Sequence, residues 1–284
     1  MTHIGAVAQL ACLLEVSAPK PGNVSPGRSF VDTCYQDFLA SAAAIGGPMS
    51  GAGTRPVGET IRLAIDATAV WTRSNTNLGI VLLLAPLARA ASLVKPDTPL
   101  RDMLRWVLAE TTVDDAKQAY AAIRQTSPGG LGHADAQDVA NEPTVTLLDA
   151  MRLAADRDTI AREYVSGFEI TFETGAPALT QARCDRLSWD DAIVETYLTL
   201  LAAVPDTHIA RRGGAVLAAG VSRRAKDALA AGGVRSAEGR QAIDALDRTL
   251  REDDNIANPG TTADLTAAAV FVMLMDGGWN AAAR

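Results

Sequence analysis

The segment that most constrains this chain is its most apolar run, residues 80–87, which directly follows a polar stretch at residues 74–79. The wider apolar segment, residues 78–94, contains Pro86 and Arg89. It is also shorter than the about 20 residues that a comfortable membrane span needs. We therefore predict that this segment forms a helix buried in the core.

The polar stretch in front of the run reads Ser74-Asn75-Thr76-Asn77-Leu78-Gly79. The first four N–H groups of a helix have no partner within it and carry partial positive charge, so they attract phosphate and other anions. Asn and Thr are also the usual N-cap residues before an apolar run. The stretch therefore predicts either an ordinary cap or a ligand-binding helix N-terminus, and both readings stay open.

Composition favours an all-α fold. Hydrophobic residues make up 48% of the 284 positions and aromatic residues only 5%, while Ala and Leu recur throughout. This mixture suits close-packed helices better than a β-sandwich. Because no linker interrupts the chain, we expect one compact domain over residues 1–284.

Helical spacing and start signals predict about a dozen helices. They cover residues 4–15, 35–45, 59–71, 78–94, 98–110, 112–125, 144–155, 159–172, 189–203, 214–230, 238–251 and 263–275. Glycine and proline predict long loops at residues 17–23, 46–58 and 127–135. The charged residues at 223–227 and 248–254 are interpreted as solvated helix faces.

The charge and the cysteine content limit which binding partners and metal or redox sites the chain can have. A formal net charge of -7 argues against a broad nucleic-acid or anionic-membrane surface. Cys12, Cys34 and Cys184 are far apart and lack the spacing of a zinc or redox pair. We expect a cytoplasmic protein that binds neither nucleic acid nor membranes, and the sequence leaves a homo-oligomer open.

Two further polar segments between predicted helices can be interpreted either as helix ends or as ligand-binding sites. Residues 206–214 combine an Asp, two Arg and two Gly, which suits a metal-bound polyphosphate and equally suits a helix C-terminus. In residues 258–264, Thr261 and Asp264 resemble a capping box. Spacing alone favours the cap in this second junction.

Four segments occur in an order that resembles a known family. They are a Pro-Lys-Pro-Gly loop at 19–22, an Asn-Thr-x-x-Gly stretch at 75–79, an Asp-Thr-x-Ile-Ala-x-Arg-Gly-Gly element at 206–214 and a Pro-Gly-x-x-Ala-Asp-Leu element at 259–265. Over most of its length the chain is similar to the triphosphoribosyl-dephospho-coenzyme A synthases, also called ATP:dephospho-CoA triphosphoribosyltransferases. The resemblance implies a mostly helical transferase that joins the ribose of ATP to a coenzyme A precursor and expels adenine.

The chain departs from the family pattern at two of its segments. Asn77 and Leu78 stand where the family carries His and Lys, so a titratable group and a cation are missing. A family Gly-Glu-Ala-Glu-Ala segment corresponds to residues 132–136, where His133 replaces one acid and Asp135 retains the other.

The resemblance implies roles for named residues. Asp206 and Asp264 would hold Mg²⁺, and Lys20, Arg211 and Arg212 would bind the triphosphate of ATP together with that ion. Asp135 is the candidate catalytic base, with Asp138 one turn away on the same face if the segment is helical. Asn75, Thr76 and Asn77 would bind sugar or base. The remaining predicted nucleotide-binding residues are Gly22, Asn23, Gly79, Thr207, Gly213, Gly214, Gly260 and Thr262.

Two alternatives remain at this stage. Because the His and Lys are missing, the chain could be a divergent member acting on another cofactor precursor, such as one in methanopterin- or methanofuran-type carrier biosynthesis. It could also be a non-catalytic helical nucleotide-binding protein. Adenine release from ATP, and the acceptor needed for it, would separate these readings.

Overall fold

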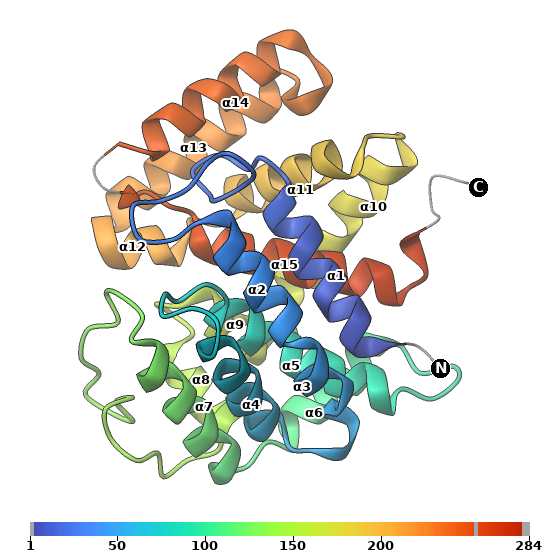
Figure 1. Ribbon diagram of the computed structural model, residues 1–284, viewed down its shortest axis with the longest axis vertical. Helices are drawn as coiled ribbons and strands as arrows, with labels where there is room; N and C mark the ends of the chain where they lie inside the picture. Colours follow the sequence, from blue (N-terminus) through green and yellow to red (C-terminus); the bar gives the residue numbers. More distant parts are fainter. Residues whose placement is uncertain (1–2, 253–254, 280–284) are drawn as a thin grey trace. The chain divides into compact units, whose positions relative to one another are not determined.

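The structure, a computed structural model, describes residues 3–252 and 255–279. The regular elements of this part are all helices, joined by loops (Figure 1). No strand occurs in these residues, and the extended pairing there is an isolated bridge between Ser25 and Arg28. The all-α prediction is confirmed. None of the described helices combines the length and the apolar character needed to cross a membrane.

The helices vary widely in length. They are α1 (Ile4–Ser17), α2 (Tyr35–Ala44), α3 (Gly46–Ser50), α4 (Val57–Ala69), α5 (Leu78–Leu93), α6 (Leu100–Ala109), α7 (Val113–Thr126), α8 (Leu147–Ala154), α9 (Thr159–Ser166), α10 (Ala176–Cys184), α11 (Trp189–Ala203), α12 (Thr207–Gly213), α13 (Ala215–Ala230), α14 (Ala237–Leu250) and α15 (Gly260–Met275). The 3-10 helices η1 (Ala52–Thr54) and η3 (Gly233–Arg235) and the π-helix η2 (Ile170–Gly175) complete the described elements.

The helices form two compact units, and each unit draws on two stretches of the chain. Unit 1 consists of Met1–Leu13 and Gln36–Glu169, and unit 2 of Leu14–Tyr35 and Ile170–Arg284. The expectation of a single domain over residues 1–284 stays a prediction.

Helix α5 is the centre of unit 1 and matches the predicted core helix. It contacts α3, α4, α6, α7 and α9, and most of its side chains are buried. Pro86 lies inside it and has no N–H, so the carbonyl of Leu82, one turn earlier, loses its helical partner. The buried Tyr164 hydroxyl donates to that carbonyl at 2.6 Å. The core therefore satisfies the polar group that the proline leaves unpaired.

Helix α15 plays the corresponding part in unit 2. From Thr261 to Leu274 every residue except Asp264 is buried, so the helix is buried around its whole circumference. It contacts α10, α11, α12 and η2. Its N-terminus therefore has a fixed position among the neighbouring elements of this unit.

Several predicted boundaries were wrong for identifiable reasons. The predicted helix at 159–172 ends at Ser166, because Gly167 adopts a left-handed conformation with φ 65° and π-helix η2 follows. The predicted loop at 46–58 contains α3 and η1. Helices α10 and α12 were not predicted, since α12 is very short and α10 buries only Ala176, Leu179 and Ala182.

Candidate functional site

The Pro-Lys-Pro-Gly loop is held in unit 2 by a buried ion pair. The Lys20 side chain is fully buried, its Nζ lies 3.0 Å from Glu15 Oε1, and it also donates to the carbonyls of Glu15 and Ala18. Burial raises the pKa of Glu15, while the charge of Lys20 lowers it. An ammonium enclosed in this way is not available to a ligand. These contacts give Lys20 a structural role. They do not support the predicted contact between Lys20 and triphosphate, which stays a prediction.

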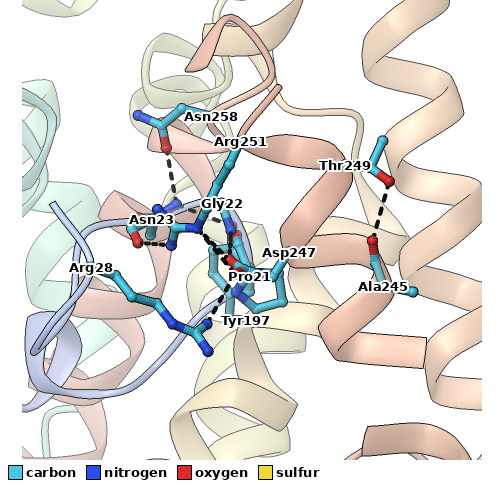
Figure 2. A network of polar contacts seen from close by, with 10 residues as sticks. All are labelled: Pro21, Gly22, Asn23, Arg28, Tyr197, Ala245, Asp247, Thr249, Arg251 and Asn258. Atoms are coloured by element: carbon cyan, nitrogen blue, oxygen red, sulfur yellow. Dashed lines mark hydrogen bonds and ion pairs between the residues drawn. The ribbon is translucent and has the colours of Figure 1, made fainter. Parts of the chain in front are cut away.

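The next residue of the motif, Gly22, is fixed by α14. It has φ 74°, and a Cβ there would lie 2.8 Å from Leu250 Cβ, so glycine is required both by conformation and by space. Its N–H donates to Asp247 Oδ1 at 2.7 Å (Figure 2). The side chain of Asp247 on α14 therefore fixes the backbone of the loop at Gly22.

Asp247 also binds two arginines that sequence reasoning did not select. Arg28 Nη1 lies 3.0 Å from Asp247 Oδ2, and Arg251 Nε lies 2.9 Å from Oδ1 and 3.0 Å from Oδ2 (Figure 2). Arg251 Nη2 donates to the carbonyl of Asn23 at 2.6 Å. The interpretation of Arg251 as part of a solvated face was wrong. The (i, i+4) spacing of Asp247 and Arg251 was a signal for their pairing, but nothing local pointed to Arg28.

Asn23 connects the loop to the segment before α15. Its Nδ2 donates to the Tyr197 hydroxyl at 3.1 Å and to Asn258 Oδ1 at 3.0 Å, and Tyr197 donates to the carbonyl of Pro21 at 2.8 Å (Figure 2). Burial and the nearby carboxylates of Asp206, Glu15 and Asp247 raise the pKa of Tyr197 well above its usual value. The phenol therefore stays neutral and acts as a hydrogen-bond donor.

Asp206 joins the N-termini of α12 and α15. Its Oδ1 caps α12 by accepting from the Ile209 N–H at 3.0 Å, and its Oδ2 accepts from both the N–H and the hydroxyl of Thr262 at 2.7 Å. Burial raises the pKa of this carboxyl, and these hydrogen bonds partly oppose the shift. At least three protein donors already occupy the carboxylate.

These contacts do not fit a magnesium ligand built on Asp206. Mg²⁺ prefers carboxylate and phosphate oxygens together with water, whereas the oxygens of Asp206 face protein donors. Within residues 3–252 and 255–279, no three His, Cys, Asp or Glu side chains are grouped so that they could hold a metal ion. Asp264, the second predicted ligand, is half-buried in the second turn of α15. The predicted capping box of Thr261 and Asp264 was wrong, because α15 begins earlier, with Pro259 at its N-cap.

The rest of the 206–214 element surrounds this junction. Thr207 Oγ1 lies 3.2 Å from Thr261 Oγ1, and a Cβ at Gly260 would lie 2.2 Å from His208 Nδ1. Arg212 is exposed and donates to the carbonyl of Asn255 at 3.0 Å. The other predicted binding residues of this element are Arg211, which is half-buried, Gly213, which ends α12, and Gly214, which has φ 88° at the N-cap of α13.

His208 should make the stability of the protein depend on pH. Burial, and then the charges of Arg211 and Arg212, lower the pKa of His208 from 6.5 to about 4. Between these values the unfolded chain binds the proton and the folded chain does not. The stabilisation is therefore complete above pH 6.5 and is lost as the pH falls toward 4, by up to about 3 kcal/mol at about 1.4 kcal/mol per pKa unit.

Urea unfolding at several pH values checks this expectation. His208→Gln should remove most of the decline in the free energy of unfolding between pH 6.5 and 4.5. His3→Gln, which changes an exposed ring, should keep the wild-type decline. A wild-type decline in His208→Gln would contradict the assignment.

The remaining motif segment, residues 75–79, lies in unit 1 at the N-terminus of α5. Asn75 accepts from the Leu78 N–H at 3.2 Å, Thr76 Oγ1 lies 2.5 Å from Ser41 Oγ, and Asn77 Nδ2 donates to Thr68 Oγ1 at 3.0 Å. Residues 74–77 line a cavity of about 230 Å³ together with residues near the ends of α4 and α7. Thr76 and Asn77 are buried, and Gly79 lies in the first turn of α5. The segment thus caps a helix beside a small cavity. Its role in binding a ligand stays a prediction.

The predicted catalytic pair, Asp135 and Asp138, lies in an irregular loop of unit 1. The segment is not helical, so the condition under which the two carboxylates would share a helix face is not met. Asp138 accepts from the N–H groups of Ala134 at 2.7 Å and Ala140 at 2.8 Å, and His133 Nδ1 lies 3.0 Å away. These backbone bonds, followed by His133, lower the pKa of Asp138. Asp135 is exposed and makes no hydrogen bond to another described residue. Of the two, Asp135 is therefore the carboxylate that is open to a substrate.

Known proteins resemble this chain over its length. The sequence model of the family described as "CitG: ATP:dephospho-CoA triphosphoribosyl transferase" matches residues 1–283. A protein of Vibrio cholerae named "Probable 2-(5''-triphosphoribosyl)-3'-dephosphocoenzyme-A synthase" is 25% identical over 95% of this chain and 87% of its own. A protein of the same name from Pseudomonas paraeruginosa is 34% identical, but over only 40% of this chain and 39% of its own. The alignments with the Pseudomonas relatives of highest identity thus span less than half the length of those proteins.

A solved structure agrees with the family match. The solved structure titled "Crystal structure of putative triphosphoribosyl-dephospho-coA synthase from Archaeoglobus fulgidus" superposes with a TM-score of 0.66 and 29% identity, over 84% of this chain and 99% of that one. The resemblance found in the four sequence segments is confirmed. By its full-length match, this chain belongs to the ATP:dephospho-CoA triphosphoribosyl transferase family.

Proposed function

We propose that this protein is a transferase that moves the triphosphoribosyl group of ATP to 3'-dephospho-CoA and releases adenine. The observation that carries the proposal is the joining of three motif segments in unit 2. Asn23 bonds to Asn258, and Asp206 bonds to Thr262, so the loop at 19–23 and the N-termini of α12 and α15 form one connected polar region. Membership of the family supplies the reaction that such a region would serve.

In this reaction one bond forms and one bond breaks at the same carbon, C1' of the ATP ribose. A hydroxyl oxygen of the acceptor bonds to C1' of the ATP ribose while the bond from C1' to the adenine nitrogen breaks, and its electron pair leaves with adenine. The hydroxyl proton passes to a base, and adenine takes up a proton. By analogy with glycoside transfer, the transition state resembles an oxocarbenium ion.

We propose Asp135 as the base that accepts the hydroxyl proton. Its carboxylate is exposed, whereas Asp138 is committed to two loop N–H groups that lower its pKa and weaken it as a base. Arg211 and Arg212, with the N–H groups around Gly213 and Gly214, are the proposed contacts of the triphosphate. Asn75, Thr76 and Asn77 remain the proposed contacts of sugar or base.

Adenine release tests the proposal. The protein should release adenine from ATP only when dephospho-CoA is present. The mass of the product should exceed that of dephospho-CoA by one triphosphoribosyl group. Asp135→Asn should lower kcat at least about 100-fold, the usual contribution of general base catalysis. Asp156→Asn, another exposed acid of unit 1, should leave kcat unchanged. The requirement for Mg²⁺ stays a prediction, and the same assay with EDTA tests it.

Other outcomes would change the conclusion. No adenine release with any acceptor, despite protection by ATP against thermal unfolding, would leave a nucleotide-binding protein. Release only with a different cofactor precursor would identify a divergent member. Wild-type turnover in Asp135→Asn would remove that residue from the mechanism and leave the reaction intact.

A further inference from the structure

Unit 2 contains a groove of about 720 Å³ along α13 and α14, which run side by side at one end of the unit (Figure 1). Volumes of about 300–1,000 Å³ are typical of sites for small molecules. None of the predicted site residues lines it. The groove has an apolar part and a basic part, which together restrict the chemistry of what it can hold.

The apolar part follows directly on the Arg-Gly-Gly end of the 206–214 element. It is formed by Val216, Leu217, Val221, Leu250 and Ile256. Val216 is 86% exposed and Leu217 37% exposed, so aliphatic surface faces solvent here and would gain from being covered. A Cβ at Gly213 would lie 2.4 Å from Leu217 Cδ2 and 3.0 Å from Ile256 Cγ2. The glycine of the motif therefore permits the end of α12 to pack against this surface.

The basic part consists of Arg223, Arg224 and Lys226, all exposed on α13. Arg224 donates to Thr249 Oγ1 at 3.1 Å, whereas Arg223 and Lys226 make no ion pair with any other described residue. Two acids, Asp227 and Glu252, also line the groove. The described lining therefore carries three positive and two negative charges, an excess of one cation on a chain whose net charge is -7. This excess favours an anionic ligand.

We propose that this groove binds the acceptor substrate of the reaction, and this inference rests on the proposed function. Dephospho-CoA joins a nucleoside through a pyrophosphate to a long, flexible and weakly polar pantetheine arm. The arm suits the aliphatic surface of Val216, Leu217 and Val221. The pyrophosphate suits Arg223 and Lys226, because guanidinium and ammonium groups bind phosphate oxygens by charge-assisted hydrogen bonds.

A second copy of the chain fits the groove less well. A two-fold interface brings the same patch of both subunits together. Each copy would then bring the same excess of one cation to the interface, which is unfavourable. A small anionic ligand avoids this repulsion and neutralises the unpaired charges.

Kinetics with variants of the groove test the proposal. Arg223→Ala and Lys226→Ala, singly and together, remove exposed cations, and Arg248→Ala removes an exposed arginine of α14 outside the groove. Val216→Asp introduces a carboxylate at the most exposed aliphatic position of the groove, in the first turn of α13, where an acid suits the helix dipole. The measurements are kcat, the KM for dephospho-CoA and the KM for ATP, with direct titration of dephospho-CoA by calorimetry.

The double variant should raise the KM for dephospho-CoA at least about tenfold, because each cation that is removed takes away a charge-assisted contact. Val216→Asp should raise it by a similar factor, because a carboxylate would lose water against the weakly polar arm. The KM for ATP should stay within about twofold, and Arg248→Ala should behave as the wild type. Wild-type KM values in all groove variants of an enzyme that releases adenine would overturn this inference and leave the proposed function standing. The inference would also be overturned if Val216→Asp kept the wild-type KM values but turned a dimer into a monomer, because a second copy would then occupy the groove.

If the wild type releases no adenine, the proposed function fails, and the calorimetric titration decides this inference separately. Binding of dephospho-CoA that the double variant weakens would support the groove. Absence of binding, or binding that the double variant leaves unchanged, would overturn it.

Discussion

Replacing Asp247 with alanine is expected to lower the free energy of unfolding by about 3 kcal/mol, because a buried N–H loses its acceptor and two partly exposed arginines lose a charge-assisted partner. Asp247 accepts from the Gly22 N–H and binds both Arg28 and Arg251. Its side chain is only 10% exposed. Without it, two guanidinium groups repel one another and a loop N–H loses its partner. Alanine is a better helix former than aspartate, so a loss of helix propensity cannot account for the effect.

Urea unfolding of Asp247→Ala against Asp191→Ala measures this cost. Asp191 also pairs with an arginine, binding Arg240 through both oxygens at 3.0 Å, but on a more exposed surface. That pair should be worth less than about 1 kcal/mol. Equal effects of the two substitutions would show that burial of Asp247 does not matter. Because Gly22 and Asn23 depend on this network, Asp247→Ala should also lower adenine release at temperatures where it remains folded.

Asp206→Ala should destabilise the protein by about 3 kcal/mol. The substitution leaves the Ile209 N–H and both donors of Thr262 without a partner in a buried region, and an unsatisfied buried donor costs about 1–3 kcal/mol. The cost of burying the carboxylate, which raises its pKa, offsets part of the loss. The N-termini of α12 and α15 would no longer be tied together.

The matched control for Asp206 is Ser188→Ala. Ser188 caps α11 by accepting from the Asp191 N–H at 3.1 Å on an exposed surface, and losing such a cap costs about 1 kcal/mol. A metal-binding role for Asp206 predicts another pattern, with little change in stability and loss of any dependence on Mg²⁺. Measuring both properties in Asp206→Ala therefore separates a structural carboxylate from a metal ligand.

Local sequence was sufficient wherever a feature depends on neighbours within a few residues. The apolar run predicted α5, and Ser188 before two acids predicted the start of α11, because caps and helical periodicity are short-range properties. The order of the four motif segments predicted the family. Composition predicted the fold class, since a chain rich in Ala and Leu with few aromatic residues packs best as helices.

Contacts between distant parts of the chain decided the role of individual side chains. Lys20 and Asp206 carry charges that suit triphosphate and metal, yet burial and protein partners give them structural roles. No motif in the sequence marked Asp247, yet its carboxylate accepts a hydrogen bond from the N–H of Gly22, 225 positions away. Tyr164 satisfies a carbonyl freed by a proline in another helix. The residue type fixes what bonds a side chain can form, but only the packed structure fixes which donors and acceptors come within reach and whether water remains to compete for them.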